Sequence, residues 1–384
     1  MADSRAARSA AVPPLRRIGA HLYRYPVETE VRTSFGVMRE RPALFVHVED
    51  EEGGVGWGEV WCNFPDCGAE HRARLIETVF APLLEGRSVA DPAAASRELA
   101  ARTAVLAIQS GEPGPIHQCI AGLDVALWDL AARREGLPLW RMLGARDPSV
   151  RVYASGINPD SPERAAQRAL AEGHRAFKLK VGFGEAVDLA NLSAMRGAIG
   201  SDLELMADAN QAWDLPQAIA MGSRMQPFAL SWIEEPLRAD SPWSEWQALA
   251  QASRIPLAAG ENLLGFDAFE AACEARSLAV IQPDVAKWGG ISGCLEVARR
   301  IRRAGLRYCP HYLGAGIGLL ASAHLLAAAG GDGMLEIDAN PNPLRTLTCG
   351  AVGRIVEGRI VLDEQPGLGA PPELERLRSF RVAL

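Results

Sequence analysis

The chain has 384 residues, of which 48% are hydrophobic and 23% are charged, so it is long enough for a large core and for more than one domain. Its net charge of −7 at pH 7 argues against binding to nucleic acid or to an anionic membrane surface. Seven cysteines, an odd number without a CxxC pair, indicate reduced thiols better than a disulfide framework or a zinc site. We therefore expect a soluble, cytoplasmic protein.

The first part of the chain predicts a tail, then strands, then helices. Residues 1–14, MADSRAARSAAVPP, contain basic residues but no apolar core, so we expect a disordered tail and not a secretory signal. From about residue 18 to 62, the runs HLYRYPV, ALFVHVED and VGWGEVW predict β structure, with the turn DEEGG between the last two. Residues from about 69 to 145 predict helices, because apolar residues recur at intervals of three and four, as in CIAGLDVALWDLAARREG.

Eight short apolar runs follow from Arg151 onward and alternate with helical stretches such as PERAAQRALAEG and SGCLEVARRIRRAG. Eight alternating β and α units are typical of a closed parallel barrel. From residue 350 the chain returns to β-like runs, GRIVEGRIVLDE, and we place this last segment against the N-terminal domain. The eight runs are VRVYASG, FKLKVG, LELMADAN, LSWIEEP, PLAAGEN, LAVIQPD, LRYCPHY and MLEIDAN.

An ionisable side chain ends each apolar run from the second onward. One such residue from each βα unit would lie on the C-terminal rim of the barrel, where active sites of this fold are found. Lys178 and Lys180 share one face of their strand, because alternate residues do so. We therefore expect both lysines to point into the barrel mouth and not into solvent. The seven rim residues are Lys180, Asp208, Glu234, Glu261, Asp284, His311 and Glu336.

Asp208, Glu234 and Glu261 come from three successive predicted strands. Three converging carboxylates would repel one another strongly without a cation. Ligation by oxygen alone favours Mg²⁺, with Mn²⁺ as the alternative ion. The neighbouring Glu235 is expected to support these ligands through hydrogen bonds.

Candidate acids and bases flank this predicted metal site. Repulsion between Lys178 and Lys180, together with the nearby cation, should depress the pKa of one lysine and make a neutral amine available as a base. Asp284 beside His311 would set the tautomer of the imidazole and raise its basicity. Glu336 would face the metal from the last strand and, if protonated, could donate a hydrogen bond to a developing oxyanion.

The motif set of KxK at 178–180, the three carboxylates, PDxxKxGG and the histidine after the seventh strand resembles the mandelate racemase subgroup of the enolase superfamily. The resemblance extends from TSFGVMRERPA through ALWDL to EQPGLG. It implies a TIM-like (β/α)7β barrel over residues 146–349 and an α+β capping domain over residues 1–145. It also implies that the segment 350–384 returns to the capping domain and that the chain forms a homo-oligomer.

By resemblance, Asp208, Glu234 and Glu261 are the metal ligands. Lys180 is then the base on one face of a small carboxylate substrate. Lys178 adjusts the pKa of Lys180 and contacts the substrate carboxylate.

The resemblance also assigns the opposite face of the substrate. His311, paired with Asp284, acts there as a base or an acid, and Glu336 hydrogen-bonds the substrate carboxylate. Asp284 stands where the muconate-lactonizing subgroup has a second lysine, which argues against that subgroup. Lys287 is expected to form an ion pair beside the ligands, and Asn210 to contact the metal or the substrate.

This resemblance implies an Mg²⁺-dependent enzyme that abstracts the proton α to a carboxylate through a metal-stabilised enediolate. We expect a dehydratase (hydro-lyase) of a hydroxy acid such as an acid sugar, with a racemase or epimerase of a 2-hydroxy acid as the alternative. Specificity should come from capping loops around 34–37 and 61–64, so Phe35 and Trp61 are the expected substrate contacts.

Three other interpretations fit less well. HYLGAGIGL has glycines after a strand, but Leu319 breaks the dinucleotide-binding spacing. A Schiff-base aldolase would leave the three carboxylates unexplained. A non-catalytic barrel protein is a remote alternative, because a decayed site usually loses ligands and this set is complete.

Overall fold

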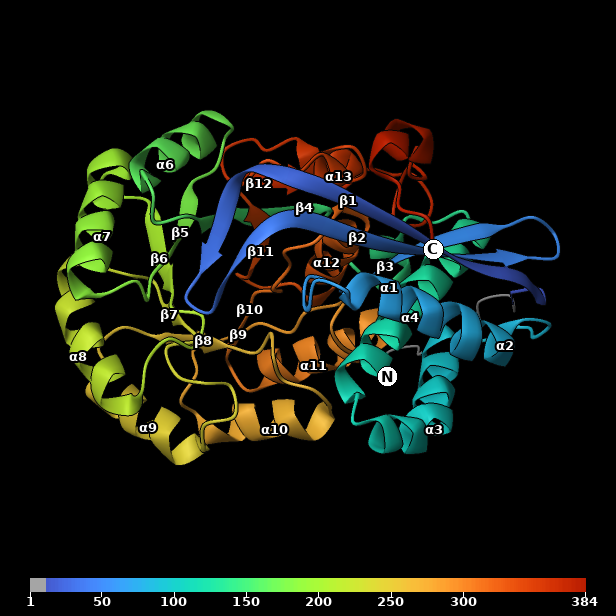
Figure 1. The fold of residues 1–384 in the computed structure, drawn as a ribbon, viewed down its shortest axis with the longest axis horizontal. Helices are drawn as coiled ribbons and strands as arrows, with labels where there is room; N and C mark the ends of the chain where they lie inside the picture. Colours follow the sequence, from blue (N-terminus) through green and yellow to red (C-terminus); the bar gives the residue numbers. More distant parts are fainter. Residues whose placement is uncertain (1–11) are drawn as a thin grey trace.

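The computed structural model describes residues 12–384, so residues 1–11 of the predicted N-terminal tail lie outside it. The described chain forms a barrel surrounded by helices, with a smaller sheet and a group of helices beside it (Figure 1). A long two-stranded hairpin links the two parts across the front of Figure 1.

The barrel contains eight parallel strands, and a helix connects each strand to the next. The predicted (β/α)7β architecture is therefore confirmed. The strands pair in the order β10-β9-β8-β7-β6-β5-β4-β11, and the two end strands meet where the Met334 N–H lies 3.4 Å from Cys309 Sγ. The strands are β4 (Ser149–Ile157), β5 (Ala176–Lys180), β6 (Glu204–Asp208), β7 (Ile233–Glu234), β8 (Leu257–Ala259), β9 (Val280–Ile281), β10 (Arg307–Tyr308) and β11 (Met334–Asp338). The connecting helices are α6 (Pro162–Ala171), α7 (Glu185–Ile199), α8 (Leu215–Met225), α9 (Trp243–Ala252), α10 (Phe266–Ala275), α11 (Gly290–Arg303) and α12 (Gly316–Ala329).

Strand β5 shows how the sequence pattern positions the barrel interior. Phe177 and Leu179 are fully buried in a core formed with residues of the surrounding helices. The alternate residues Lys178 and Lys180 face the opposite way and are only 1% and 4% exposed, so both point into the barrel as predicted.

A layer of apolar side chains fills the barrel below these lysines. Each strand or its immediate flank contributes one member, so the barrel is a packed core and not a pore. The indole of Trp232 meets the ring of Tyr153 edge-on, with ring centres 5.8 Å apart. The layer consists of Tyr153, Ala176, Met206, Trp232, Ala258, Val280, Cys309 and Met334.

The smaller part is the cap, a three-stranded antiparallel sheet covered by helices. The predicted DEEGG turn joins its second and third strands. Gly56 and Gly58 allow the cap helix α4 to lie against this sheet, because a Cβ at either position would come within 2.1 Å of a helix carbonyl oxygen. The elements are β1 (Leu15–Thr33), β2 (Gly36–Asp50), β3 (Val55–Val60), α1 (Gly68–Leu75), the π-helical turn η1 (Ile76–Phe80), α2 (Ala81–Leu84), α3 (Pro92–Ser110), α4 (Pro113–Arg134) and α5 (Leu139–Met142).

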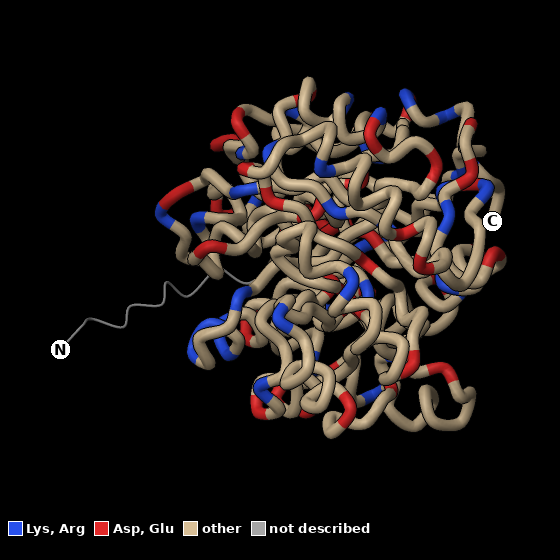
Figure 2. The backbone as a smooth tube through the Cα atoms, turned by 90° about the vertical axis from the view of Figure 1, so that its left-hand side faces the viewer, with Lys and Arg blue, Asp and Glu red and all other residues tan. Residues whose placement is uncertain are grey.

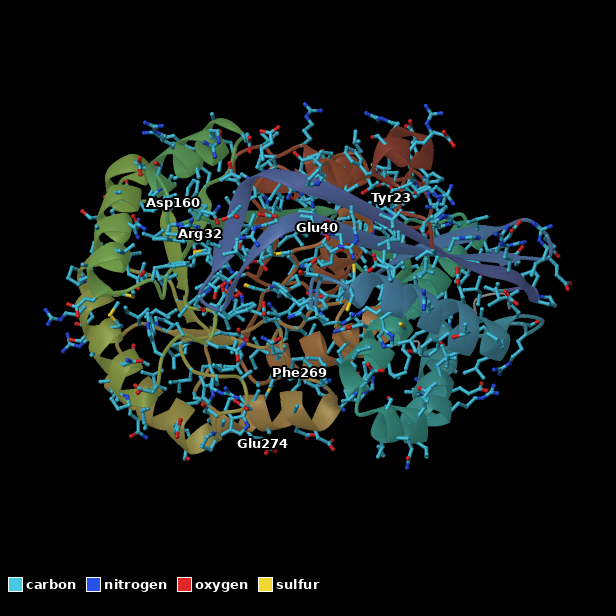
Figure 3. The ribbon with its side chains drawn as sticks, in the orientation of Figure 1. Tyr23, Arg32, Glu40, Asp160, Phe269 and Glu274 are labelled. Atoms are coloured by element: carbon cyan, nitrogen blue, oxygen red, sulfur yellow. The ribbon has the colours of Figure 1, made fainter. Side chains whose placement is uncertain are left out.

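The β1–β2 hairpin is longer than predicted, and its tip rests on the C-terminal end of the barrel. Ser34 Oγ at the tip donates to the carbonyl oxygen of Asn210 at 2.7 Å. Arg32 lies beside Asp160 of the loop that follows β4, with 3.7 Å between the charged groups (Figure 3). These contacts place the residues of the hairpin tip over the barrel mouth.

The C-terminal segment contacts both parts of the molecule. We placed this segment against the N-terminal domain, and part of it also joins the barrel, since β12 (Arg359–Val361) pairs antiparallel with the barrel strand β4. Farther along, the Val382 N–H donates to the carbonyl oxygen of Leu22 in the cap at 2.9 Å. The short helical elements not yet given are η2 (Gln226–Phe228), α13 (Pro343–Thr346), η3 (Gly350–Gly353) and η4 (Leu374–Phe380).

No helix within residues 12–384 is long and apolar enough to cross a membrane. Basic and acidic residues are interspersed along the backbone in the view of Figure 2. The most apolar helix, α12, contains His324, which is 1% exposed. The Trp140 N–H donates to His324 Nδ1 at 2.9 Å, and the ring also hydrogen-bonds the backbone of Leu368.

We predict that His324 makes the protein sensitive to mild acid. Burial lowers the pKa of His324 from 6.5 to about 3, so the unfolded chain takes up this proton more readily than the folded one. The contribution of neutral His324 to the free energy of unfolding is therefore fully present above pH 6.5 and is lost as the pH falls towards 3. At pH 5 this loss amounts to about 2 kcal/mol. Denaturant unfolding of wild-type protein and His324→Gln between pH 7 and 5 checks this, since the variant should show a shallower pH slope. Equal slopes would contradict the prediction, because the other histidines are the same in both proteins.

Candidate active site

A cavity of about 290 Å³ lies at the C-terminal end of the barrel, between the strand ends and the cap. It is lined from the barrel by Lys180, Asn210, Glu261, Lys287 and His311, and from the cap by Phe35, Trp61 and Phe64, among others. The remaining rim residues do not line the cavity, are at most 2% exposed and lie deeper in the barrel. These are Lys178, Asp208, Glu234, Asp284 and Glu336.

The two lysines each form ion pairs with carboxylates of neighbouring strands. Lys178 Nζ lies 2.6 Å from Glu234 Oε2 and 2.7 Å from Glu336 Oε1. Lys180 Nζ donates to Asp208 Oδ2 at 2.6 Å and to the side-chain oxygen of Asn210 at 2.7 Å. Both amines therefore belong to one buried polar network, and Lys180 is the member that reaches the cavity.

The protein charges alone depress the pKa of neither lysine. The prediction of a depressed pKa also included a nearby cation, so it stays a prediction. Burial lowers the pKa of Lys178, but the carboxylates of Glu234 and Glu336 outweigh it and hold that pKa well above its usual value. Burial also lowers the pKa of Lys180, and the charge of Asp208 reverses the effect, so this pKa is raised as well. Repulsion between the lysines acts in the predicted direction but is smaller than these attractions.

The three carboxylates predicted to hold a metal are each paired with a cationic side chain. Asp208 pairs with Lys180, Glu234 with Lys178, and Glu261 Oε2 lies 2.5 Å from His311 Nε2. In the part of the chain that the structure describes, no three His, Cys, Asp or Glu side chains are grouped so that they could hold a metal ion. Their convergence on one cation therefore stays a prediction.

The charges at this end of the barrel nevertheless fit a divalent cation. Burial, followed by the carboxylates of Asp208, Glu336 and Glu261, raises the pKa of Glu234 to about 7. Burial, followed by Glu261 and Asp208, raises the pKa of Glu235 to about 8. Six carboxyl groups face four cationic groups, so two negative charges are left over when all are ionised, and the donors are the oxygens that Mg²⁺ prefers. The carboxyl groups are Asp208, Glu234, Glu235, Glu261, Asp284 and Glu336, and the cationic groups are Lys178, Lys180, Lys287 and His311.

His311 lies between two carboxylates. Its Nδ1 donates to Asp284 Oδ2 at 2.7 Å, and Asp284 Oδ1 accepts from the backbone of Ala286 at 2.8 Å. Burial lowers the pKa of His311, but Glu261, Glu336 and the bond to Asp284 raise it well above 6.5. Asp284 thus orients a charged imidazole whose Nε2–H points towards Glu261 and the cavity.

The charges around Glu336 favour its ionised form, whereas hydrogen-bond donation was expected only of its protonated form. Burial raises its pKa, but Lys178 and His311 overcome this effect and lower the pKa to about 2. Both oxygens are acceptors, Oε1 from Ser155 Oγ at 2.5 Å and Oε2 from the backbone N–H of Tyr312 at 2.9 Å.

The residues expected to contact or support the site lie around the cavity. Glu235 Oε1 accepts from Asn262 Nδ2 at 2.8 Å, and the same amide donates to Glu261. Lys287 Nζ lies 3.2 Å from Glu261 Oε1 and 4.8 Å from the ring centre of Trp61. Phe35 is 59% exposed and meets the ring of Phe64 edge-on.

Two of the polar groups that sequence reasoning missed hold carboxylates of the site. Gln282 Nε2 donates to Glu234 Oε2 at 2.6 Å, and Ser155 holds Glu336. Gln282 stands two residues before Asp284, so the alternation of the strand could have revealed it. Ser155 is an ordinary uncharged residue in a predicted strand, and no sequence signal distinguishes it.

Comparison with known protein families agrees with the fold and with the motifs of the site. Residues 19–144 match the family described as "Mandelate racemase / muconate lactonizing enzyme, N-terminal domain", and residues 161–376 match "Enolase C-terminal domain-like". The chain therefore belongs to the enolase superfamily, in its mandelate racemase subgroup.

Known relatives give this membership a more specific context. The chain is 30% identical to D-galactarolactone cycloisomerase of Agrobacterium fabrum over 383 residues, covering 95% of this chain and 98% of that protein. It is 60% identical to a mandelate racemase/muconate lactonizing enzyme from Bordetella bronchiseptica RB50, with a TM-score of 0.91 over 96% of this chain and 99% of that one. The L-talarate/galactarate dehydratase of Salmonella typhimurium LT2, liganded with Mg and L-lyxarohydroxamate, is 28% identical, with a TM-score of 0.85 over 100% of this chain and 96% of that one.

Proposed function

We propose that this protein is an Mg²⁺-dependent dehydratase that removes the proton α to the carboxylate of a hydroxy acid and expels the β-hydroxyl. One observation carries this proposal. Lys180, at the end of β5, and His311, just after β10, are both buried and both reach the same cavity, and their strands are three steps apart around the closed barrel by way of β4 and β11. A substrate between them can meet a base on one face and an acid on the other.

Asp208, Glu234 and Glu261 would hold the cation, with Mn²⁺ as the alternative ion. Their support is the all-oxygen donor set, the excess of buried carboxyl groups over lysine and histidine side chains around these positions, and the magnesium in the Salmonella dehydratase. When bound, the cation would supply positive charge to the carboxylate on which negative charge develops and would compete with Lys180 for Asp208.

Lys180 is the proposed base. It must lose the proton that its ion pair with Asp208 stabilises before it can accept the α-proton. Lys178 keeps its charge because Glu234 and Glu336 surround it, so it is suited to stabilise an anion and not to accept a proton.

His311 is the proposed acid. Asp284 orients the ring. If Glu261 binds the metal ion in place of His311, the Nε2–H of His311 is free to donate its proton to the departing β-hydroxyl. Ionised Glu336 keeps Lys178 and the backbone after His311 in place, and we assign it no proton donation.

The same pair of groups also favours a second candidate, racemisation or epimerisation, in which His311 returns a proton to the α-carbon. The first step is common to both reactions, so only the fate of the intermediate distinguishes them.

Incubation with a panel of hydroxy acids in heavy water tests this function. A dehydratase should release a 2-keto-3-deoxy acid from one substrate, whereas a racemase should return substrate of inverted configuration that carries deuterium at the α-carbon. If no hydroxy acid gains α-deuterium or loses water in the presence of Mg²⁺, the proposed function is wrong.

A further inference from the structure

Arg41 is a buried arginine of the cap that reaches the barrel. It belongs to β2, is 3% exposed, and its Nη2 donates to Asp338 Oδ2 at 2.5 Å. Asp338 ends strand β11 two residues after Glu336, so this arginine lies over the C-terminal end of the same strand. Arg41 also lines the cavity that contains Lys180 and His311.

The guanidinium of Arg41 has hydrogen-bond donors that the protein does not use. Its Nε is buried and has no hydrogen-bond partner within residues 12–384. Among the described residues, its Nη1 hydrogen-bonds only the sulfur of Met38, at 3.5 Å, and a thioether is a weak acceptor. A buried N–H without an acceptor is unfavourable, so the guanidinium keeps donor capacity that its contact with Asp338 does not use.

The charge around Arg41 is also unbalanced in favour of an anion. Asp338 Oδ2 is shared with a second guanidinium, because Arg345 Nη1 lies 3.5 Å from it. Asp338 Oδ1 is occupied by the backbone and side-chain amides of Asn340 at 3.0 and 2.8 Å. One carboxylate therefore faces two buried guanidinium groups, and one positive charge remains beside the cavity wall.

We propose that Arg41 binds an anionic group at the end of the substrate remote from the reacting carboxylate, so that the substrate is a dicarboxylate. This inference rests on the proposed function, since it assumes that Lys180 and His311 act at the carbon next to the other, reacting carboxylate. A guanidinium presents paired N–H groups that match the two oxygens of a carboxylate. The cavity, at about 290 Å³, is at the small end of ligand sites, which suits a compact sugar diacid.

The competing explanation is that Arg41 only joins the cap to the barrel through Asp338. That role uses Nη2 and leaves Nε without a function. The two explanations differ in what they predict for substrates that are identical except at the remote end.

The test compares sugar diacids with the monoacids of the same configuration, in which the remote carboxylate is replaced by CH₂OH. The wild-type protein should prefer the diacid by about 10- to 100-fold in kcat/KM, the effect of a charge-assisted bond. Arg41→Gln should bring this ratio close to one, mainly through a higher KM for the diacid. Arg345→Gln is the matched control, because it touches the same Asp338 but does not line the cavity, and its ratio should stay as in the wild type.

Arg41→Lys keeps a positive charge beside Asp338, so it can be measured if Arg41→Gln fails to fold. It should also lower the diacid-to-monoacid ratio, because lysine lacks the paired N–H groups of the guanidinium. A wild-type ratio of one, or an unchanged ratio in the Arg41 variants, would overturn the proposal. Deuterium exchange at the α-carbon separates this failure from a failure of the proposed function. If monoacids exchange as fast as diacids, only the role of Arg41 is wrong, whereas the absence of exchange with every acid refutes the function itself.

Discussion

Lys180→Ala should lower turnover by about 10²- to 10⁴-fold, the usual contribution of a positioned general base. Lys180 is the lysine of the pair that lines the cavity, and alanine leaves no group there to take the α-proton. In heavy water, the variant should also lose α-deuterium exchange at the proton that faces β5. His311→Asn should keep that exchange while losing product formation, because the base on the other side is intact.

Lys180→Arg is the matched control for charge. Arginine can keep the ion pair with Asp208, but it does not deprotonate in proteins and so cannot act as a base. We expect this variant to be as inactive as Lys180→Ala and to melt closer to the wild type. If either Lys180 variant keeps wild-type turnover and exchange, Lys180 is not the base.

Glu234→Gln should weaken Mg²⁺ binding by more than about 100-fold and remove activity. We expect an effect of this size because loss of a residue that only hydrogen-bonds a metal ligand already lowers metal affinity by about 10- to 100-fold. Titration calorimetry measures the affinity directly. The melting temperature gives a second readout, because Mg²⁺ stabilises a folded protein that binds it, and this shift should disappear in the variant.

Glu235→Gln is the matched comparison, since it makes the same change one residue away. The Glu235 carboxylate reaches Glu261 only through Asn262, so its loss should weaken Mg²⁺ binding less than the loss of Glu234. Wild-type Mg²⁺ affinity in Glu234→Gln, or a larger effect in Glu235→Gln, would show that the ligands are assigned incorrectly.

The barrel interior was predictable because strand periodicity is a local property. In five strands, an ionisable residue stands two positions after a residue of the apolar layer, so both face inward. Lys178 follows Ala176 in this way, and Glu336 follows Met334. Counting alternate residues along each run therefore identified most of the polar interior before any contact was known. Glu261 departs from this spacing because it comes after Gly260, beyond the end of β8.

The partners of these residues were not predictable from their positions in the chain. Lys178 lies closer to Glu234 than to Asp208, at 2.6 against 3.9 Å, although Asp208 belongs to the adjacent strand. Such distances depend on side-chain conformations packed among eight strands. The electrostatic consequences follow from them: the protein charges alone raise the pKa of both lysines and lower that of Glu336 to about 2, which no residue's position in the chain reveals.

The sequence by itself determined the number of βα units, the inward face of each strand and the family, because these depend on local periodicity and on motifs of a few residues. The tertiary structure alone decided which groups meet across the barrel and which part of the cap covers it. Arg41 illustrates the difference, since it lies 297 positions from Asp338 in the chain and the sequence around it does not indicate that the two side chains meet beside the cavity. Contacts between residues so far apart are set by the packing of the cap on the barrel, because burial of apolar surface holds the two parts together and only then fixes the distances between their charges.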